Sequence, residues 1–535
     1  MGDRGGRLAR SAGLAGAATL GSRVLGLARE TVLAAIFGAG NDMDAFNVAF
    51  RIPNLVRDLF AEGAMSAAFV PTFTRHLTRH GKTDAWRVGN NVINALILIT
   101  GTLVALAMIG ARPLVGAYAP EYASVPGKLD LTIRLTLVTL PFLTLATLAA
   151  ALMGMLNSLN RYFVPALAPA TFNAAMIACA FALVPLMPAL GWPPIMAIAI
   201  AAIIGGVGQI AVQLPPLARE GFRYRPRLDL RDASLREVLV LMGPGTIGLA
   251  ATQVNLFVNT QLATAQGTGA VSWLSYAFRL MYLPIGLFGV SIATAVLPAA
   301  ARHATLDDKV AMRDTVARGL ALMAMMNVPA TLGLAILATP IVRLLFERGQ
   351  FLPADTAATA AALRFYAIGL VGYSTVRIAS PVFYALGQSR VPVAASLLSM
   401  AVNVVASLLL VDALGFRGLA LGTSIAALAN GGVLLVLLGR RLPGAGGTHL
   451  LTSTAKLLVA SVGMAIVAWF VERTLGQAVP GGGVMIEAGR LLAAIGSGLA
   501  VLVVSAKLLR LAELDEAIVA ARDVARTFLT PRSSP

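Results

Sequence analysis

Long apolar runs recur along almost the whole chain, and they constrain the fold more than any other feature of the sequence. A helix that crosses a bilayer needs about 20 mostly apolar residues. Fourteen such runs are found at 12–38, 43–74, 87–111, 131–156, 163–187, 193–217, 236–264, 269–300, 315–345, 357–386, 391–411, 416–439, 452–472 and 484–508. The sequence therefore predicts an all-α polytopic membrane protein with 14 transmembrane helices.

The charge content excludes a soluble protein. Only 13% of the 535 residues are charged and 57% are hydrophobic, whereas soluble domains carry roughly 25% charged residues. The net charge of +17 would suggest nucleic acid as a partner of a soluble chain. In a membrane protein, an excess of basic residues belongs in cytoplasmic loops near anionic lipid. We therefore expect membrane lipids and no nucleic acid as partners.

The residues that build metal centres and catalytic sites are scarce. Cys179, the single cysteine, lies inside an apolar run, and four histidines cannot form a metal centre without carboxylates. No phosphate-binding Gly-rich loop, zinc-binding HExxH or nucleophile elbow occurs. We expect no disulfide, metal, cofactor or catalytic residue, and hence no enzyme.

Basic residues are distributed unevenly over the loops. They concentrate at 75–87, 219–236 and 440–441, after the second, sixth and twelfth runs. The alternate loops 38–44 and 187–194 are poor in them. Because basic loops remain in the cytoplasm, both termini are predicted to be cytoplasmic.

The sequence also repeats itself with an offset of 227 residues. Phe69-Val70-Pro71 before Arg75-His76 matches Val296-Leu297-Pro298 before Arg302-His303, and Val164-Pro165 matches Val391-Pro392. The offset spans six runs, an even number, which predicts two six-helix lobes in parallel repeat around a central cavity. The predicted domains are 1–225, 226–445, the two extra C-terminal helices in 446–510, and a cytoplasmic amphipathic helix and tail in 511–535.

Ionisable residues inside the runs are the candidate site. They are Arg23, Arg29 and Glu30 in the first run, Asp44, Arg51, Arg57, Asp58 and Glu62 in the second, Arg279 in the eighth and Arg377 in the tenth. An arginine at mid-membrane costs about 2.5–3.5 kcal/mol on insertion scales. These groups must therefore face water or each other, and Pro53 is expected to break the second helix where it lines the cavity.

Two interpretations of these charges remain open. Arg23 and Glu30 are seven residues apart, as are Asp44, Arg51 and Asp58, so the carboxylates can form structural ion pairs. The arginines outnumber the acids, however, and a cationic cavity favours an anionic ligand such as phosphate. The candidates for substrate binding are Arg23, Arg29, Arg57 and Arg279, followed by Arg51 and Arg377.

Several separated motifs resemble one known family. They are Ser22–Glu30, Ile36–Gly40, Asp44–Phe46, Arg51–Arg57, Phe60–Ala64, Ala68–Pro71, Val271–Trp273 and Arg279–Met281. Together they resemble the MurJ (MviN) lipid II flippases over essentially the whole chain. The resemblance implies the fold of the multidrug/oligosaccharidyl-lipid/polysaccharide exporter superfamily and a place in the bacterial cytoplasmic (inner) membrane.

The resemblance also implies a substrate and residue roles. The substrate would be lipid II, undecaprenyl-diphosphate-linked disaccharide-pentapeptide, moved from the cytoplasmic to the periplasmic leaflet. Arg23, Arg29, Arg57 and Arg279 would be the functional cavity arginines, Asp44 would lie at the outer gate, and the last two helices would form a groove for the lipid tail. A cell-wall synthesis complex is a candidate partner. Asp58 and Phe278 depart from the family, since many relatives have a basic and an acidic residue at these positions.

Other functions stay open at this point. A flippase for another lipid-linked glycan, such as O-antigen units, would need the same cavity chemistry. A membrane enzyme acting on such a lipid would need acids, histidines or a metal gathered at one face of the membrane. A scaffold role would leave the buried arginines without a purpose.

Overall fold

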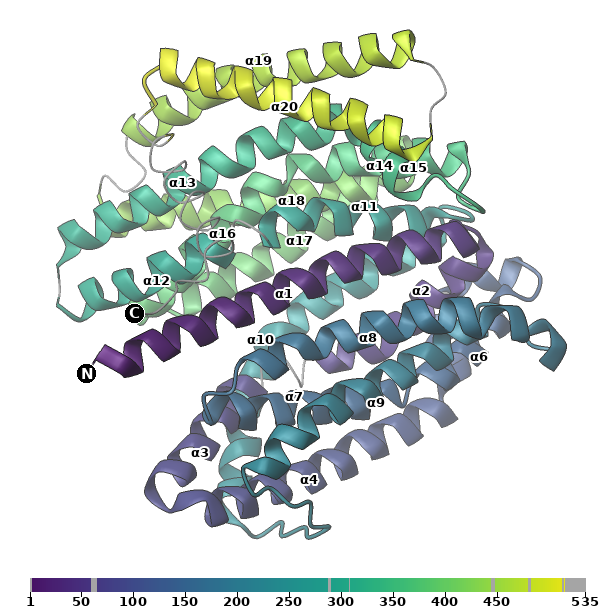
Figure 1. Ribbon diagram of the computed structural model, residues 1–535, viewed down its shortest axis with the longest axis vertical. Coiled ribbons are helices and arrows are strands. Elements are labelled where there is room, and N and C mark those ends of the chain that lie inside the picture. Colours follow the sequence, from purple (N-terminus) through teal and green to yellow (C-terminus); the bar gives the residue numbers. More distant parts are fainter. Residues whose placement is uncertain are drawn as a thin grey trace. The chain divides into compact units, whose positions relative to one another are not determined.

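The computed structural model describes residues 2–58, 65–286, 290–306, 308–443, 448–479, 483–511 and 514 (Figure 1). In these residues the chain consists of helices joined by turns, without a strand, which confirms the predicted all-α class. Glu62 and almost all of the predicted C-terminal amphipathic helix lie outside the described residues. The chain forms two compact units, Met1–Val271 and Ser272–Pro535, called the first and second unit below.

The described residues of the first unit form ten α-helices. They are α1 (Gly2–Phe37), α2 (Asn41–Arg57), α3 (Met65–Arg79), α4 (Gly81–Ile109), α5 (Ala111–Tyr118), α6 (Lys128–Thr139), α7 (Phe142–Ser158), α8 (Phe163–Ala182), α9 (Met196–Arg219) and α10 (Ala233–Thr264). Three short 3-10 turns, η2 (Pro120–Ser124), η3 (Val184–Leu186) and η4 (Pro188–Leu190), lie between them. In Figure 1, α1 runs alongside α8, and α8 packs in turn on α9.

The remaining helices belong to the second unit, whose first helix begins at the boundary. They are α11 (Ala270–Pro284), α12 (Val290–Thr305), α13 (Lys309–Ile336), α14 (Ala338–Phe346), α15 (Pro353–Ile368), α16 (Leu370–Ala385), α17 (Arg390–Leu414), α18 (Phe416–Arg441), α19 (Thr448–Ala478) and α20 (Val484–Leu508). The last two form a helical hairpin (Figure 1).

Every predicted span falls on one helix or on two consecutive helices. Within the described residues, nine stretches are long and apolar enough to cross a membrane: Gly81–Ile109, Lys128–Ser158, Phe163–Leu186, Met196–Arg219, Lys309–Ile336, Arg390–Leu414, Phe416–Arg441, Thr452–Ala478 and Val484–Leu508. The other five predicted spans lie on α1, α2–α3, α10, α11–α12 and α15–α16. One of these five is divided within the described residues, at Gly369 between α15 and α16.

The internal repeat is visible in the helix boundaries. Adding 227 to Phe163, the start of α8, gives 390, where α17 starts, and adding it to Ala111 gives 338, where α14 starts. The order α1–α9 recurs as α10–α18, and the division of one span into α6 and α7 recurs as α15 and α16. This element order supports the predicted duplication. The boundary between the two compact units lies after Val271, whereas the sequence placed the domain boundary at 225/226. The difference arises because α10 packs on α3, α4 and α5 of the first unit.

The helix of the second span continues past Pro53, where the sequence predicted a break. Pro53 lies inside α2, which continues to Arg57 before α3 begins at Met65. The Asn54 side chain donates its Nδ2 hydrogen to the Phe50 carbonyl at 2.8 Å. Pro53 has no amide hydrogen to donate to the Ala49 carbonyl, and the helix continues without that one backbone bond.

Small residues set the spacing of helices in the second unit. A Cβ atom placed on Gly372 in α16 would lie 2.5 Å from the backbone of Ala427 in α18. A Cβ on Gly422 of α18 would lie 2.6 Å from the Ser407 hydroxyl in α17. Lipid chains are as apolar as leucine, so close backbone packing rather than the hydrophobic effect holds such helices together.

This spacing predicts that Gly372→Ala destabilises the protein. The added methyl meets backbone atoms, which cannot rotate away, and overpacking of this kind costs about 1–3 kcal/mol. Gly432→Ala in α18 is the matched control, since nothing lies within 4 Å of its Cβ position. Thermal unfolding in detergent should show a lower midpoint for Gly372→Ala only. Equal midpoints for both variants would contradict close packing at Gly372.

Candidate functional site

The charges of α1 are arranged around Arg29. Its Nε donates to Glu30 Oε1 at 3.0 Å, its Nη2 also contacts that carboxylate, and its Nη1 donates to Asn173 Oδ1 in α8 at 3.0 Å. The guanidinium carbon lies 5.7 Å from the centre of the Phe172 ring. Glu30 therefore pairs with its neighbour Arg29 and not with Arg23, seven residues away.

Arg23 occupies a different environment. It lies near the middle of the first predicted span, is only partly buried, and has no side-chain hydrogen bond or ion pair with any described residue. Its neighbour Ser22 is engaged through the backbone, because Asn173 donates to the Ser22 carbonyl at 3.1 Å. Arg23 thus presents a cation that the described protein groups do not neutralise.

The second span contains a buried ion pair that sequence reasoning missed. Asp44 in α2 is fully buried, and its Oδ2 accepts from Lys128 Nζ in α6 at 3.0 Å and from the Gly269 amide at 2.7 Å. Lys128 is 3% exposed and lies 4.2 Å above the centre of the Tyr122 ring. Asp44 thereby joins α2 to α6 and to the turn before α11.

The other ionisable candidates of the second span, Arg51, Arg57 and Asp58, are less buried than Asp44. Arg51 donates from Nη1 to Thr260 Oγ1 in α10 at 2.9 Å. Arg57 pairs with the adjacent Asp58 at 2.7 Å, and both side chains are about one-third exposed. The seven-residue spacing of Asp44, Arg51 and Asp58 suggested that they pair with one another. The contacts described here instead join them to Lys128, Thr260 and Arg57.

The two candidates in the second unit, Arg279 and Arg377, differ in burial. Arg279 is partly buried in α11. Arg377 in α16 is exposed and donates to the hydroxyl of Tyr282, whose ring centre is 5.9 Å from its guanidinium carbon. Phe278, which departs from the family pattern, packs its ring 5.8 Å from Tyr282 and 5.5 Å from Tyr366, measured between centroids.

Histidines and a carboxylate meet at the end of α3. His76 Nδ1 lies 2.5 Å and His80 Nδ1 3.9 Å from Asp84 Oδ2 in α4. Ligand atoms of the three residues lie within 4.8 Å of one another, a grouping that can hold a metal ion. Asp84 also accepts from Arg87, which competes with such an ion for its charge. Histidines alone cannot form a metal centre here, and the fold brings the carboxylate of Asp84 to two of them.

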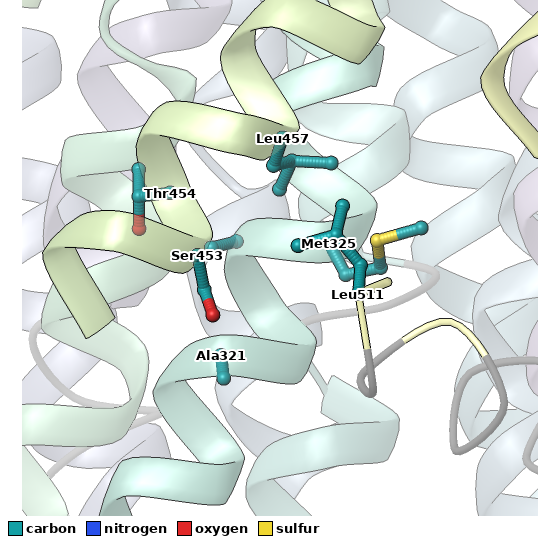
Figure 2. Close-up of a pocket in the computed structure, with 7 residues that line it drawn as sticks. Ala321, Met325, Ser453, Thr454, Leu457 and Leu511 are labelled. Carbon is teal, nitrogen blue, oxygen red and sulfur yellow. The ribbon is translucent and has the colours of Figure 1, made fainter. Parts of the chain in front are cut away.

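A small pocket lies between α13 and α19, beside Leu511 (Figure 2). Its volume is about 10 Å³, near the least that one water molecule needs. Ala321, Met325 and Leu457 line it. It is a packing gap and not a site for a lipid chain, so the predicted lipid-tail groove on α19 and α20 remains a prediction.

The duplicated helical order, the broken helices and the ionisable groups within the spans define a multi-pass membrane transporter. The family model described as lipid II flippase MurJ matches residues 33–488. The chain belongs to the lipid II flippase MurJ family, and it is a multi-pass protein of the inner membrane.

Individual relatives agree with this placement. The chain is 32% identical to the probable lipid II flippase MurJ of Vibrio cholerae over 477 residues, which cover 87% of this chain and 86% of that one. It is 36% identical to the corresponding protein of Rhizobium meliloti over 468 residues, 84% of each chain. Both exceed what chance similarity of apolar helices would give.

Solved structures show the same fold. A lipid II flippase MurJ in an inward closed conformation matches with a TM-score of 0.74 and 25% identity, covering 93% of this chain and 99% of that one. An inward-facing multidrug resistance MATE family transporter of the MOP superfamily matches with a TM-score of 0.66 over 80% and 96% of the two chains. The latter is 17% identical and indicates the fold alone.

The buried pair predicts an asymmetric response to mutation. Lys128→Met leaves the Asp44 carboxylate buried without its cation and should lower the free energy of unfolding by about 3–5 kcal/mol. Asp44→Asn combined with Lys128→Met removes both charges and should recover most of that loss. Arg112→Met, which breaks an exposed ion pair with Asp130, is the control and should cost less than about 1 kcal/mol. Unfolding in detergent measures all three, and a double variant no better than Lys128→Met would refute the pairing.

Proposed function

We propose that this chain moves lipid II from the cytoplasmic to the periplasmic leaflet by alternating access. The match to the family model, over residues 33–488, includes most of both compact units, so the proposal concerns both units. The observation that carries it is Arg23, a partly buried cation in the middle of a membrane span with no partner among the described residues. A position of that kind is stable beside water or an anion, and the diphosphate of lipid II is an anion.

The remaining arginines take roles that follow from their contacts. Arg29 is held by Glu30 and Asn173, so its guanidinium is fixed in place before any ligand arrives. We propose Arg51 and Arg57 as further headgroup contacts from α2, and Arg279 and Arg377 as the contribution of the second unit. Asp44 acts as a gate residue. Its ion pair with Lys128 joins α2 to α6, so a movement of α2 away from α6 has to break that pair.

The arginine proposal is tested by reconstitution. Arg23→Ala should reduce lipid II flipping at least tenfold, because one charge-assisted contact to phosphate is worth roughly 1.5–3 kcal/mol. Arg23→Lys should retain part of the activity if charge dominates over the bidentate grip. Arg134→Ala removes an exposed arginine of α6 and is the matched control. The measurement is a leaflet-specific lipid II assay in proteoliposomes, with thermal unfolding to verify folding. Unchanged flipping by folded Arg23→Ala would exclude Arg23 as a substrate ligand.

The orientation is the second part of the proposal. Both termini lie in the cytoplasm, because the loops around 75–87, 219–236 and 440–441 carry the basic residues. A reporter that is active only in the periplasm should be silent when fused after Arg441 or at the C-terminus, and active when fused in the 187–194 loop. An active C-terminal fusion would mean an odd number of spans.

A further inference from the structure

A large hollow lies at the N-terminal end of α4, away from the charged residues of α1 and α2. Its volume is about 580 Å³, and it is an open hollow bounded by α4 and the 220–232 segment that joins α9 to α10, all within the first unit. Its charged lining residues are four arginines and three carboxylates: Arg87, Arg223, Arg225 and Arg227, with Asp84, Asp229 and Asp232. This volume falls within the range of about 300–1,000 Å³ typical of small-molecule sites.

The 220–232 segment is held in place by a row of asparagines on α4. Asn90 donates to the Arg223 carbonyl at 3.0 Å and accepts from the Arg225 amide at 2.8 Å. Asn91 donates to the Asp229 carbonyl at 2.9 Å and accepts from the Asp229 amide at 2.7 Å. Asn94 donates to the carbonyls of Arg225 and Arg227. These side chains satisfy the backbone of the segment as a neighbouring strand would.

Both ends of the segment are anchored as well. Phe222 is buried, and its ring lies 5.4 Å from that of Trp86 in α4. Asp232 caps α10 by accepting from the amides of Ser234 and Leu235. Burial alone would raise the pKa of the Asp232 carboxyl, but these amides and the Arg87 guanidinium lower it, so the carboxylate stays charged at neutral pH.

The fixed segment presents three arginines to the hollow. Positions 223, 225 and 227 alternate along the chain, and all three side chains line the hollow. None of them has a side-chain partner among the described residues. The neighbouring cations differ: Arg87 pairs with Asp84 and Asp232, while Lys82 and Arg161 both pair with Glu220. Uncommitted charge is thus concentrated where the hollow lies.

We propose that this hollow is a binding site for a phosphorylated ligand, held by Arg223, Arg225 and Arg227. Three exposed arginines that line one hollow can supply several guanidinium donors to the oxygens of a diphosphate. The orientation rule for membrane proteins requires only basic residues near the cytoplasmic surface. That rule does not require a backbone fixed by asparagines, or three arginines that line the same hollow.

Two sources carry this chemistry. One is a soluble nucleoside diphosphate, and the other is the headgroup of an anionic phospholipid at the membrane surface. In the orientation proposed above, the site faces the cytoplasm. This orientation is the one part of the proposed function on which the binding site rests. Binding to the site does not depend on flipping.

The test compares two triple variants of equal charge in the full-length protein. Arg223→Gln, Arg225→Gln and Arg227→Gln together empty the hollow of its free cations. Arg79→Gln, Arg219→Gln and Arg231→Gln remove the same charge from nearby exposed residues that do not line it. Each is reconstituted in nanodiscs of neutral phosphatidylcholine, which expose both faces, and is titrated calorimetrically with uridine diphosphate. A second series replaces the nucleotide with increasing phosphatidylglycerol in the nanodisc and measures lipid binding by native mass spectrometry.

We expect the hollow variant to bind uridine diphosphate or phosphatidylglycerol at least tenfold more weakly than the wild type, and the outer variant to stay within about twofold. The series that shows this difference identifies the source. Asn91→Ala keeps every charge but releases the Asp229 backbone, so it should also weaken binding. Equal losses in both triple variants, or no binding of either ligand to the wild type, would overturn the proposal. Flipping by the same wild-type sample shows separately whether transport is intact.

Discussion

An ion inside a bilayer must find a partner or water, and this requirement governs how the charged helices are built. Arg29 is satisfied by its neighbour Glu30 and by Asn173 across the interface with α8. Asp44 is satisfied by Lys128 and a backbone amide in complete burial. Arg23 has no such partner among the described residues, although it lies in the same helix as Arg29. The contrast separates charges that hold helices together from a charge that remains available to a ligand.

The repeat shows how one scaffold serves two chemistries. The positions of Asp44 and Lys128 correspond, 227 residues later, to Val271 and Asp355. In the second unit Asp355 accepts from Trp273 Nε1 at 2.9 Å, and Trp273 itself corresponds to Phe46. A fully buried ion pair therefore joins α2 to α6, whereas an indole hydrogen bond joins the corresponding helices α11 and α15. Helix order was duplicated, whereas the polar contacts between the helices were not.

The sequence predicted the helices well because membrane spans must be long, apolar and internally hydrogen-bonded. It predicted side-chain partners poorly because spacing along one helix says nothing about neighbouring helices. Arg23 and Glu30 share a helix face, yet Glu30 is taken by the adjacent Arg29. Lys128 precedes the fourth apolar run and gave no signal that it belongs beside Asp44. Pro53 was expected to end a helix that in fact continues to Arg57.

The asparagines of α4 have a consequence for the connection between the repeats. Irregular surface segments are usually the places where proteases cut and where insertions are tolerated. The 220–232 segment has no helix before Ala233, yet Asn90, Asn91 and Asn94 occupy its backbone groups and Phe222 fixes its start. A protease needs an extended, free backbone. This segment should therefore resist cleavage although most of its residues are exposed. Should it be severed, α10 would still be retained, because its contacts with α3, α4 and α5 do not depend on the covalent link.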